Sequence, residues 1–142
     1  VVLLDSLTAL GRAYNLAAPA NGRVLVAGVD ASAVHPPKQL FGAARKLEEA
    51  GSLTMLATAL VESGSAVDEL FFEELAGAAN LELRLSTSRA AQGLVPAVDP
   101  AASGTRHEDR LLAPAEAAVV GDLRKKLSEA STQQALERAI AR

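Results

Sequence analysis

The chain has 142 residues, 49% of them hydrophobic and 22% charged, so it can bury one core but is too short to be expected to form two. It has no cysteine, which excludes a disulfide framework, a thiolate metal site and a cysteine nucleophile, and which favours a cytoplasmic protein. The net charge of −3 does not favour a protein that binds nucleic acid over its whole surface, because Lys and Arg provide the affinity for phosphate.

The chain begins with four large aliphatic residues, 1–4, that end in the acidic residue Asp5. Such a run predicts a short strand buried on both faces, which is typical of a central strand in a parallel sheet. A carboxylate at the carboxyl end of this strand lies where open α/β sheets bind ligands, and in nucleotide hydrolases it holds Mg²⁺ or its waters. The alternative is that Asp5 only caps the helix predicted over residues 6–14.

The next elements are a long irregular stretch, a helix and a second strand, over residues 15–36, 37–50 and 52–60. Proline and glycine punctuate the irregular stretch, and loops of this length are usually functional or mobile. The helix has a proline in its first turn and Gly51 just past its end. The second strand is apolar, and we expect it to lie parallel to the first.

Ser65 and Asp68 have the spacing of a capping box for a helix over residues 67–75. Beyond this helix the pattern predicts a half-exposed strand, a polar turn, a short edge strand and two helices, over residues 81–86, 87–93, 94–98, 115–127 and 132–141. The alternation of strands and helices predicts an α/β fold with a mainly parallel sheet and flanking helices. Aromatic residues make up only 3% of the chain, so the large core residues are expected to be Tyr14, Phe41, Phe71 and Phe72.

Short blocks of residues occur in a characteristic order along most of the chain. They are residues 5–15, 28–30, 37–38, 41–45, 51–54, 57–60, 64–65, 68–69, 73–74, 77, 80, 96–99 and 103–106. In these blocks the chain, from Val1 to about Leu127, resembles the ATP-hydrolysing domain of the Rho family of transcription termination factors. The resemblance implies a hexameric RNA translocase of the RecA-like class.

The resemblance also implies how the chain is organised. Residues 1–113 would be the second half of a RecA-like ATPase core, and residues 114–142 a helical tail. The phosphate-binding loop G-x-x-x-x-G-K-[ST] is missing, since no Gly-Lys pair occurs in the chain. We therefore expect the chain to be part of a longer protein and not to form a complete ATP site by itself.

Three residues would serve the nucleotide if the resemblance holds. Asp5 and Ser6 would lie beside the nucleotide, with Asp5 holding Mg²⁺ through water. Arg106, in the run 103–106, would be an arginine finger that acts across a subunit boundary. The residues alone favour another interpretation, in which Arg106 is a surface residue paired with Glu108 or Asp109.

Two loops, over residues 19–30 and 62–68, would face RNA in the channel of a ring. Their implied RNA contacts are Arg23, Val24, Gly28, Asp30, Gly64 and Ser65. The resemblance therefore implies ATP and Mg²⁺ as cofactors and RNA and further copies of the chain as partners, and it allows RNA polymerase as another. No apolar run approaches the length of a membrane-spanning helix, so no membrane partner is expected.

The chain departs from the family where Ala66, Ala76 and Gly93 replace basic residues, which indicates a divergent or degenerate copy. Three functions stay open. The first is an RNA-dependent ATPase that terminates transcription, and the second is a non-catalytic structural or interaction module. The third is a RecA-like ATPase of another branch that does not handle RNA. A phosphate-binding loop upstream of Val1 would favour an enzyme.

Overall fold

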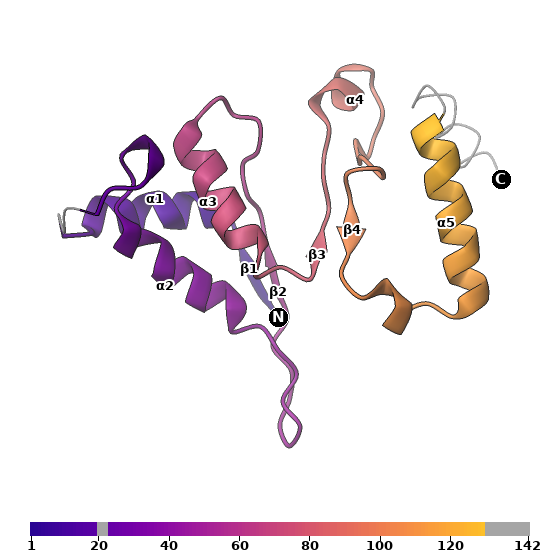
Figure 1. The fold of residues 1–142 in the computed structure, drawn as a ribbon, viewed down its shortest axis with the longest axis horizontal. Coiled ribbons are helices and arrows are strands. Elements are labelled where there is room, and N and C mark those ends of the chain that lie inside the picture. Colours follow the sequence, from indigo (N-terminus) through magenta and orange to yellow (C-terminus); the bar gives the residue numbers. More distant parts are fainter. Residues whose placement is uncertain (20–22, 130–142) are drawn as a thin grey trace. The chain divides into compact units, whose positions relative to one another are not determined.

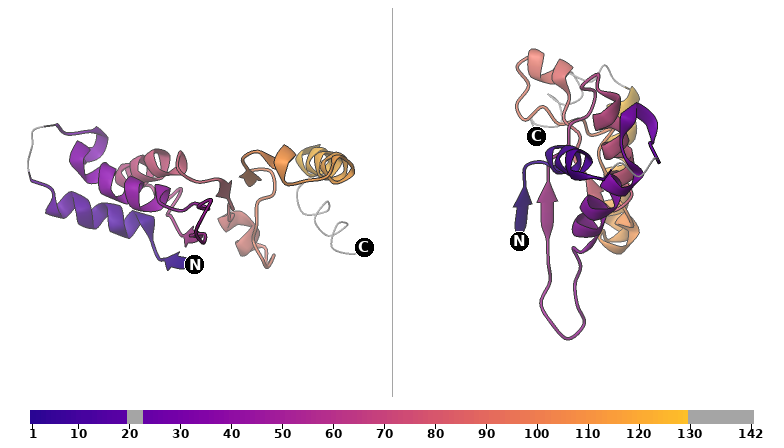
Figure 2. Two further views of the ribbon diagram at one scale, coloured as in Figure 1. Left: turned by 90° about the horizontal axis from the view of Figure 1, so that it is seen from below. Right: turned by 90° about the vertical axis from the view of Figure 1, so that its left-hand side faces the viewer.

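The computed structural model describes residues 1–19 and 23–129, which form two compact units that divide between Ala79 and Asn80 (Figures 1 and 2). The helix predicted over residues 132–141 lies outside the described residues. Among the residues that are described, no helix is both long and apolar enough to cross a membrane.

The first unit contains a parallel pair of strands and three long helices. The strands are β1 (Val2–Leu4) and β2 (Met55–Ala57), paired so that Leu4 lies opposite Ala57. The α-helices are α1 (Leu7–Ala17), α2 (Ala31–Gly42) and α3 (Ala66–Ala76), with a 3-10 turn η1 (Val26–Gly28) before α2. This arrangement confirms the predicted α/β fold with a parallel sheet and flanking helices.

The prediction that β1 is buried on both faces is wrong for the described structure. Val2 is 40% exposed and Leu3 76% exposed. Within the described residues β1 pairs with β2 alone, and only its last residue, Leu4, packs against the core. A parallel strand becomes buried when neighbouring strands and helices cover it on both sides, and most of β1 lacks that cover here.

The core of the first unit lies where the three helices meet. Its buried hydrophobic residues are Leu7, Val29, Ala33, Val34, Phe71 and Leu75. Phe71 is fully buried, as the sequence predicted, and Phe41 packs against the edge of the cluster. Tyr14 was wrongly predicted as a core residue, since it is 39% exposed.

The boundaries of α2 differ most from the prediction. The helix begins at Ala31 and contains Pro36 and Pro37, although proline removes a helical hydrogen bond. The Asp30 carboxylate caps the helix by accepting a hydrogen bond of 2.8 Å from the amide of Ser32, and Pro37 itself is buried in the packed face. Capping and burial therefore outweigh the cost of the prolines.

Residues 43–54 form a hairpin-like loop in place of the predicted helix end and strand start (Figure 2). Lys46 and Ser52 form an isolated antiparallel bridge across it, and the amide of Leu53 donates to the carbonyl of Arg45 at 2.9 Å. The predicted second strand is thus confirmed only in its middle, as β2.

The second unit contains β3 (Leu81–Glu82), α4 (Thr87–Ala91), β4 (Gly104–Thr105), the 3-10 turn η2 (Glu108–Arg110) and α5 (Pro114–Glu129). The first of the two predicted carboxyl-terminal helices, over residues 115–127, is confirmed as α5. The predicted edge strand over residues 94–98 is wrong, because only Val98 forms a bridge there, to Leu85. The partner of β3 is instead β4, in antiparallel register.

Candidate nucleotide and RNA site

The carboxyl ends of β1 and β2 bring Asp5 beside Thr58. Because Leu4 and Ala57 are paired, the residues that follow them leave the same edge of the sheet. The Thr58 hydroxyl donates to Oδ1 of Asp5 at 2.6 Å, and the Thr58 amide donates to the carbonyl of Leu4 at 3.1 Å. The Asp5 carboxylate is exposed, and the bond from Thr58 holds it in one orientation.

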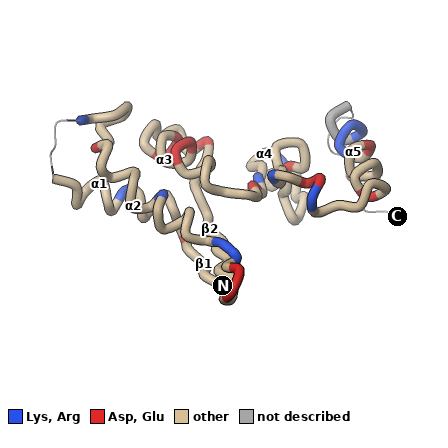
Figure 3. The backbone as a smooth tube through the Cα atoms, turned by 60° about the horizontal axis from the view of Figure 1, so that its bottom comes forward, with Lys and Arg blue, Asp and Glu red and all other residues tan. Residues whose placement is uncertain are grey.

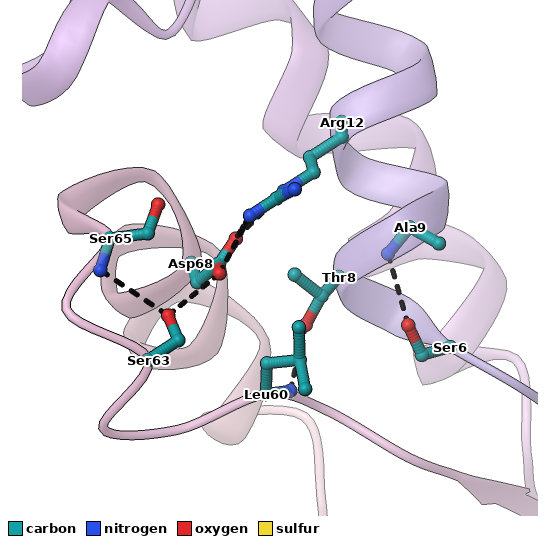
Figure 4. A network of polar contacts seen from close by, with 8 residues as sticks. All are labelled: Ser6, Thr8, Ala9, Arg12, Leu60, Ser63, Ser65 and Asp68. Atoms are coloured by element: carbon teal, nitrogen blue, oxygen red, sulfur yellow. Dashed lines mark hydrogen bonds and ion pairs between the residues drawn. The ribbon is translucent and has the colours of Figure 1, made fainter.

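Ser6 caps helix α1. Its side-chain oxygen accepts a hydrogen bond of 3.1 Å from the amide of Ala9, as Figure 4 shows. The alternative in which Asp5 serves only as the helix cap is therefore wrong, because Ser6 has that role. Asp5 instead bonds to the neighbouring strand end, which leaves its second oxygen, Oδ2, without a hydrogen bond from the described residues.

Asp5 can contribute one ligand to a magnesium ion. Among residues 1–19 and 23–129, no three His, Cys, Asp or Glu side chains are grouped so that they could hold a metal by themselves. Mg²⁺ usually binds one or two carboxylates together with waters and substrate phosphates, a pattern that a single oriented Asp fits. The chain does not provide a phosphate-binding loop for the triphosphate, because it has no Gly-Lys pair.

Arg106 follows directly after β4 and is exposed. Its amide donates to the carbonyl of Asn80 at 2.8 Å, which extends the pairing of β3 and β4 and fixes the backbone at this point. Glu108, which the sequence offered as its partner, accepts hydrogen bonds of 2.7 and 2.5 Å from Arg124 of α5. These bonds hold the pKa of the Glu108 carboxyl below its ordinary value.

The segment that leads into Arg106 is braced by polar contacts. The Ser103 hydroxyl donates to the carbonyl of Asp99 at 2.6 Å and accepts from the amide of Arg84 at 2.9 Å. The Asp99 carboxylate accepts from the amides of residues 101 and 102 and lies 3.7 Å from the buried guanidinium of Arg89. Sequence reasoning missed this brace, because Asp99 and Ser103 are the only polar side chains in the five residues before Gly104.

The first loop predicted to face RNA is described over residues 23–30. Val24 and Asp30 form an antiparallel bridge at its base, and the amide of Leu25 donates to the carbonyl of Val29 at 2.7 Å. Gly28 has a φ of +78° near the tip, a conformation that favours glycine. Arg23, Val24 and Gly28 are exposed.

Asp30, also predicted to contact RNA, has structural contacts. Its carboxylate caps α2, and its amide donates to Oδ1 of Asn15 on α1 at 2.8 Å. These bonds join the base of the first loop to two helices. No contact of Asp30 with RNA is needed to account for its position.

Of the second loop, predicted over residues 62–68, only residues 62–65 precede α3, because the helix begins at Ala66. Glu62 and Gly64 both have a positive φ, +54° and +74°. The predicted capping box is wrong: Ser65 is the residue before the helix, but its side chain makes no capping bond. The side chain of Asp68 turns to Ser63 and Arg12 instead (Figure 4).

Charge is unevenly distributed over these elements. Figure 3 shows acidic residues gathered on α3, whereas α5 carries both acidic and basic residues. The second loop has no Lys or Arg, and the described part of the first loop has Arg23 alone. Asp5 and both loops belong to the first unit, whereas Arg106 belongs to the second.

The fold places the chain in a class of proteins. It is similar to the structure of a prototypical ATPase from the type III secretion system of pathogenic bacteria, with a TM-score of 0.76 and 23% identity over 89% of this chain and 37% of that one. The chain therefore has the RecA-like ATPase fold. No family model matches it.

Relatives with higher sequence identity to the chain carry the name transcription termination factor Rho. The chain is 60% identical to transcription termination factor Rho of Micrococcus luteus and 57% identical to that of Streptomyces lividans, over 96% of its length in both cases. It is 54% identical to Rho of Streptomyces coelicolor over its whole length. The chain matches a fragment of transcription termination factor Rho, spanning 20%, 19% and 34% of these relatives.

Proposed function

We propose that the chain is part of a Rho-type, RNA-dependent ATPase that terminates transcription. One observation carries the proposal: in a chain that matches Rho, Asp5 stands exposed at the carboxyl end of β1 and is oriented by Thr58. Bound Mg²⁺ would supply charge neutralisation on the phosphates of ATP. Asp5 would hold this ion through water, and the Thr58 bond would keep the free carboxylate oxygen facing it.

Arg106 is proposed as the residue that acts on a neighbouring subunit. A guanidinium can neutralise charge that develops on a transferring phosphoryl group. The hydrogen bond of the Arg106 amide fixes the backbone at this residue, which would reduce the number of positions that its guanidinium can take. This role requires a homo-oligomer, for which a hexameric ring is our proposal. Residues 1–113 would form part of the ATPase core and residues 114–142 a helical tail.

RNA would be contacted by the two loops of the first unit. Arg23 is the proposed phosphate contact of the first loop, with Val24, Gly28 and Asp30 shaping it, and Gly64 and Ser65 are the proposed contacts of the second. A soluble transcription factor of this kind would work in the cytoplasm, with RNA polymerase as a further proposed partner.

A non-catalytic module is the second candidate function. Its support is that the second loop has no Lys or Arg, and that the Rho resemblance implies basic residues where this chain has Ala66, Ala76 and Gly93. In that case the fold would be kept for its contacts with other proteins and not for ATP turnover.

The test is RNA-stimulated ATP hydrolysis by the longer Rho-type protein that contains this chain, here named the parent protein. Arg106→Ala is compared with Arg110→Ala, the matched control in the nearby η2 turn. We expect Arg106→Ala to lower turnover about 10³-fold or more and the control to leave it unchanged. Stimulated turnover that survives Arg106→Ala would remove the finger role, and no turnover in the unmodified protein would favour the non-catalytic module.

A further inference from the structure

Two polar residues of α1 hold the chain that leaves β2. Thr8 and Arg12 are four residues apart and so lie on one face of the helix. The side-chain oxygen of Thr8, a residue only 2% exposed, accepts from the amide of Leu60 at 2.9 Å. One turn further along, Arg12 reaches Asp68 at the start of α3 (Figure 4).

Asp68 is the centre of this network. It is 1% exposed and accepts three hydrogen bonds: 2.8 Å from Nε of Arg12, 2.7 Å from Nη2 of Arg12 and 2.8 Å from the hydroxyl of Ser63. A buried carboxylate is stable only when it is paired and bonded in this way. Ser63 in turn accepts a hydrogen bond of 3.3 Å from the amide of Ser65, so the network also joins two residues within the second loop.

The shape of the second loop depends on these side chains. Glu62 and Gly64 both occupy the left-handed region, which for Glu62 is an unfavourable conformation that surrounding contacts must maintain. Because the loop has no Lys or Arg, any contact that it makes with RNA phosphates has to come from main-chain amides and serine hydroxyls. The direction of those groups is set by the loop's shape and not by a flexible side chain.

We infer that Ser63 and Arg12 are positioning residues which, through Asp68, hold residues 62–65 in the shape that contacts RNA. They tie this loop to α1, the helix that begins two residues after Asp5. The RNA contact and the nucleotide side of the domain therefore share one rigid connection. This inference rests on the proposed function, since it takes the second loop to face RNA.

Ser63→Ala is the informative variant in the parent protein, because Ser63 is exposed and its loss leaves the Arg12 and Asp68 pair intact. Ser63→Thr keeps a hydroxyl, and Ser52→Ala removes an exposed serine hydroxyl from a different loop. The measurements are the concentration of single-stranded RNA that gives half-maximal stimulation of ATP hydrolysis, and hydrogen exchange of the amides of residues 62–66.

We expect Ser63→Ala to raise the half-maximal RNA concentration about three- to tenfold, the effect of losing one typical hydrogen bond. Exchange of the loop amides should become faster, whereas Ser52→Ala should change neither property. Ser63→Thr should restore both properties. Arg12→Lys keeps the charge but loses the bidentate hydrogen bonds to Asp68, so it should also raise the half-maximal RNA concentration and speed the exchange of the loop amides.

The outcomes separate the two proposals. If RNA stimulates the unmodified parent but Ser63→Ala has the same RNA dependence or the same loop exchange, the positioning role is overturned and the proposed function stands. If RNA does not stimulate the unmodified parent, the proposed function itself is overturned, and the positioning role falls with it.

Discussion

Gly11 of α1 lies directly against the ring of Phe71 of α3. A Cβ atom built on Gly11 would come within 2.6 Å of the ring atom Cδ1 and within 2.7 Å of Cε1, closer than real carbon contacts allow. Phe71 is fully buried at the centre of the core, so its ring has little room to move. The lack of a side chain at Gly11 therefore lets α1 and α3 pack at this distance.

The first prediction is that Gly11→Ala destabilises the chain. Alanine favours a helix more than glycine does, but here the added methyl group overpacks the core, which costs about 1–3 kcal/mol. Gly42→Ala is the matched control, since Gly42 ends α2 and a Cβ there meets none of the described residues within 4 Å. Unfolding of the purified chain in urea compares the two. Equal midpoints for both variants would contradict the close packing of Gly11 on Phe71.

The second prediction concerns the pH dependence that Asp68 confers. Burial by itself raises the pKa of the Asp68 carboxyl, but the hydrogen bond from Ser63 and the hydrogen bonds and charge of Arg12 together lower it below the ordinary value of 3.8. A lowered pKa in the folded state means that the ionised carboxylate stabilises the fold above pH 3.8. This stabilisation is lost as the pH falls through the folded pKa.

Asp68→Asn should therefore be less stable than the unmodified chain near neutral pH, and the difference should shrink as the pH falls below about 4. Urea unfolding at a series of pH values between about 3 and 7 measures this difference. A gap that stays constant down to pH 3 would show that Asp68 contributes through its shape alone.

The third prediction is that Arg89→Met leaves the second unit at least as stable as before. The Arg89 side chain is only 8% exposed, and its Nη1 atom has no hydrogen-bond partner among the residues that the structure describes. An unsatisfied buried polar atom costs about 1–3 kcal/mol, and an apolar residue of similar length removes that cost.

Asp99→Ala should do the opposite, because it leaves the Arg89 charge buried without its neighbour and removes the acceptor for the amides of residues 101 and 102. Thermal unfolding of the two variants should shift in different directions. A loss of stability in Arg89→Met as large as that in Asp99→Ala would mean that the ion pair is worth more than its 3.7 Å distance suggests.

The fourth prediction tests the orientation of Asp5 by Thr58. In the parent protein, Thr58→Val removes the hydroxyl that donates to Oδ1 while keeping the shape of the side chain. Residues that orient a metal ligand typically affect metal affinity or activity by about 10-fold, so the Mg²⁺ concentration needed for half-maximal ATP hydrolysis should rise about that much. Thr58→Ser, which keeps the hydroxyl, should behave like the unmodified protein. An unchanged Mg²⁺ requirement in Thr58→Val would contradict this role.

Local patterns were sufficient to predict several elements. Apolar periodicity and turn residues that lie close together in the chain predict the first strand, its parallel partner and the helices α1, α3 and α5. They also place Asp5 directly after the first strand. The ordered blocks of residues also indicated the Rho resemblance, which the relatives confirm.

The position of α2 could not be predicted in this way. Pro36 and Pro37 argue against a helix when only local preferences are considered, yet Asp30 caps the helix and residues such as Val34 bury its apolar face in the core. The predicted strand over residues 94–98 failed for a related reason, since β3 pairs with β4, a two-residue segment too short to show a pattern.

By itself, then, the sequence determined the class of fold, the order of most helices and strands, and the residues that could carry chemistry. Only the tertiary structure decided which side chains meet. Thr58 is 53 residues from Asp5 and Asp68 is 56 residues from Arg12, and no local pattern specifies either pair. The pairing of β1 with β2 and the packing of α1 on α3 bring these groups together, because the burial of apolar surface that folds the chain also sets the positions of its polar side chains.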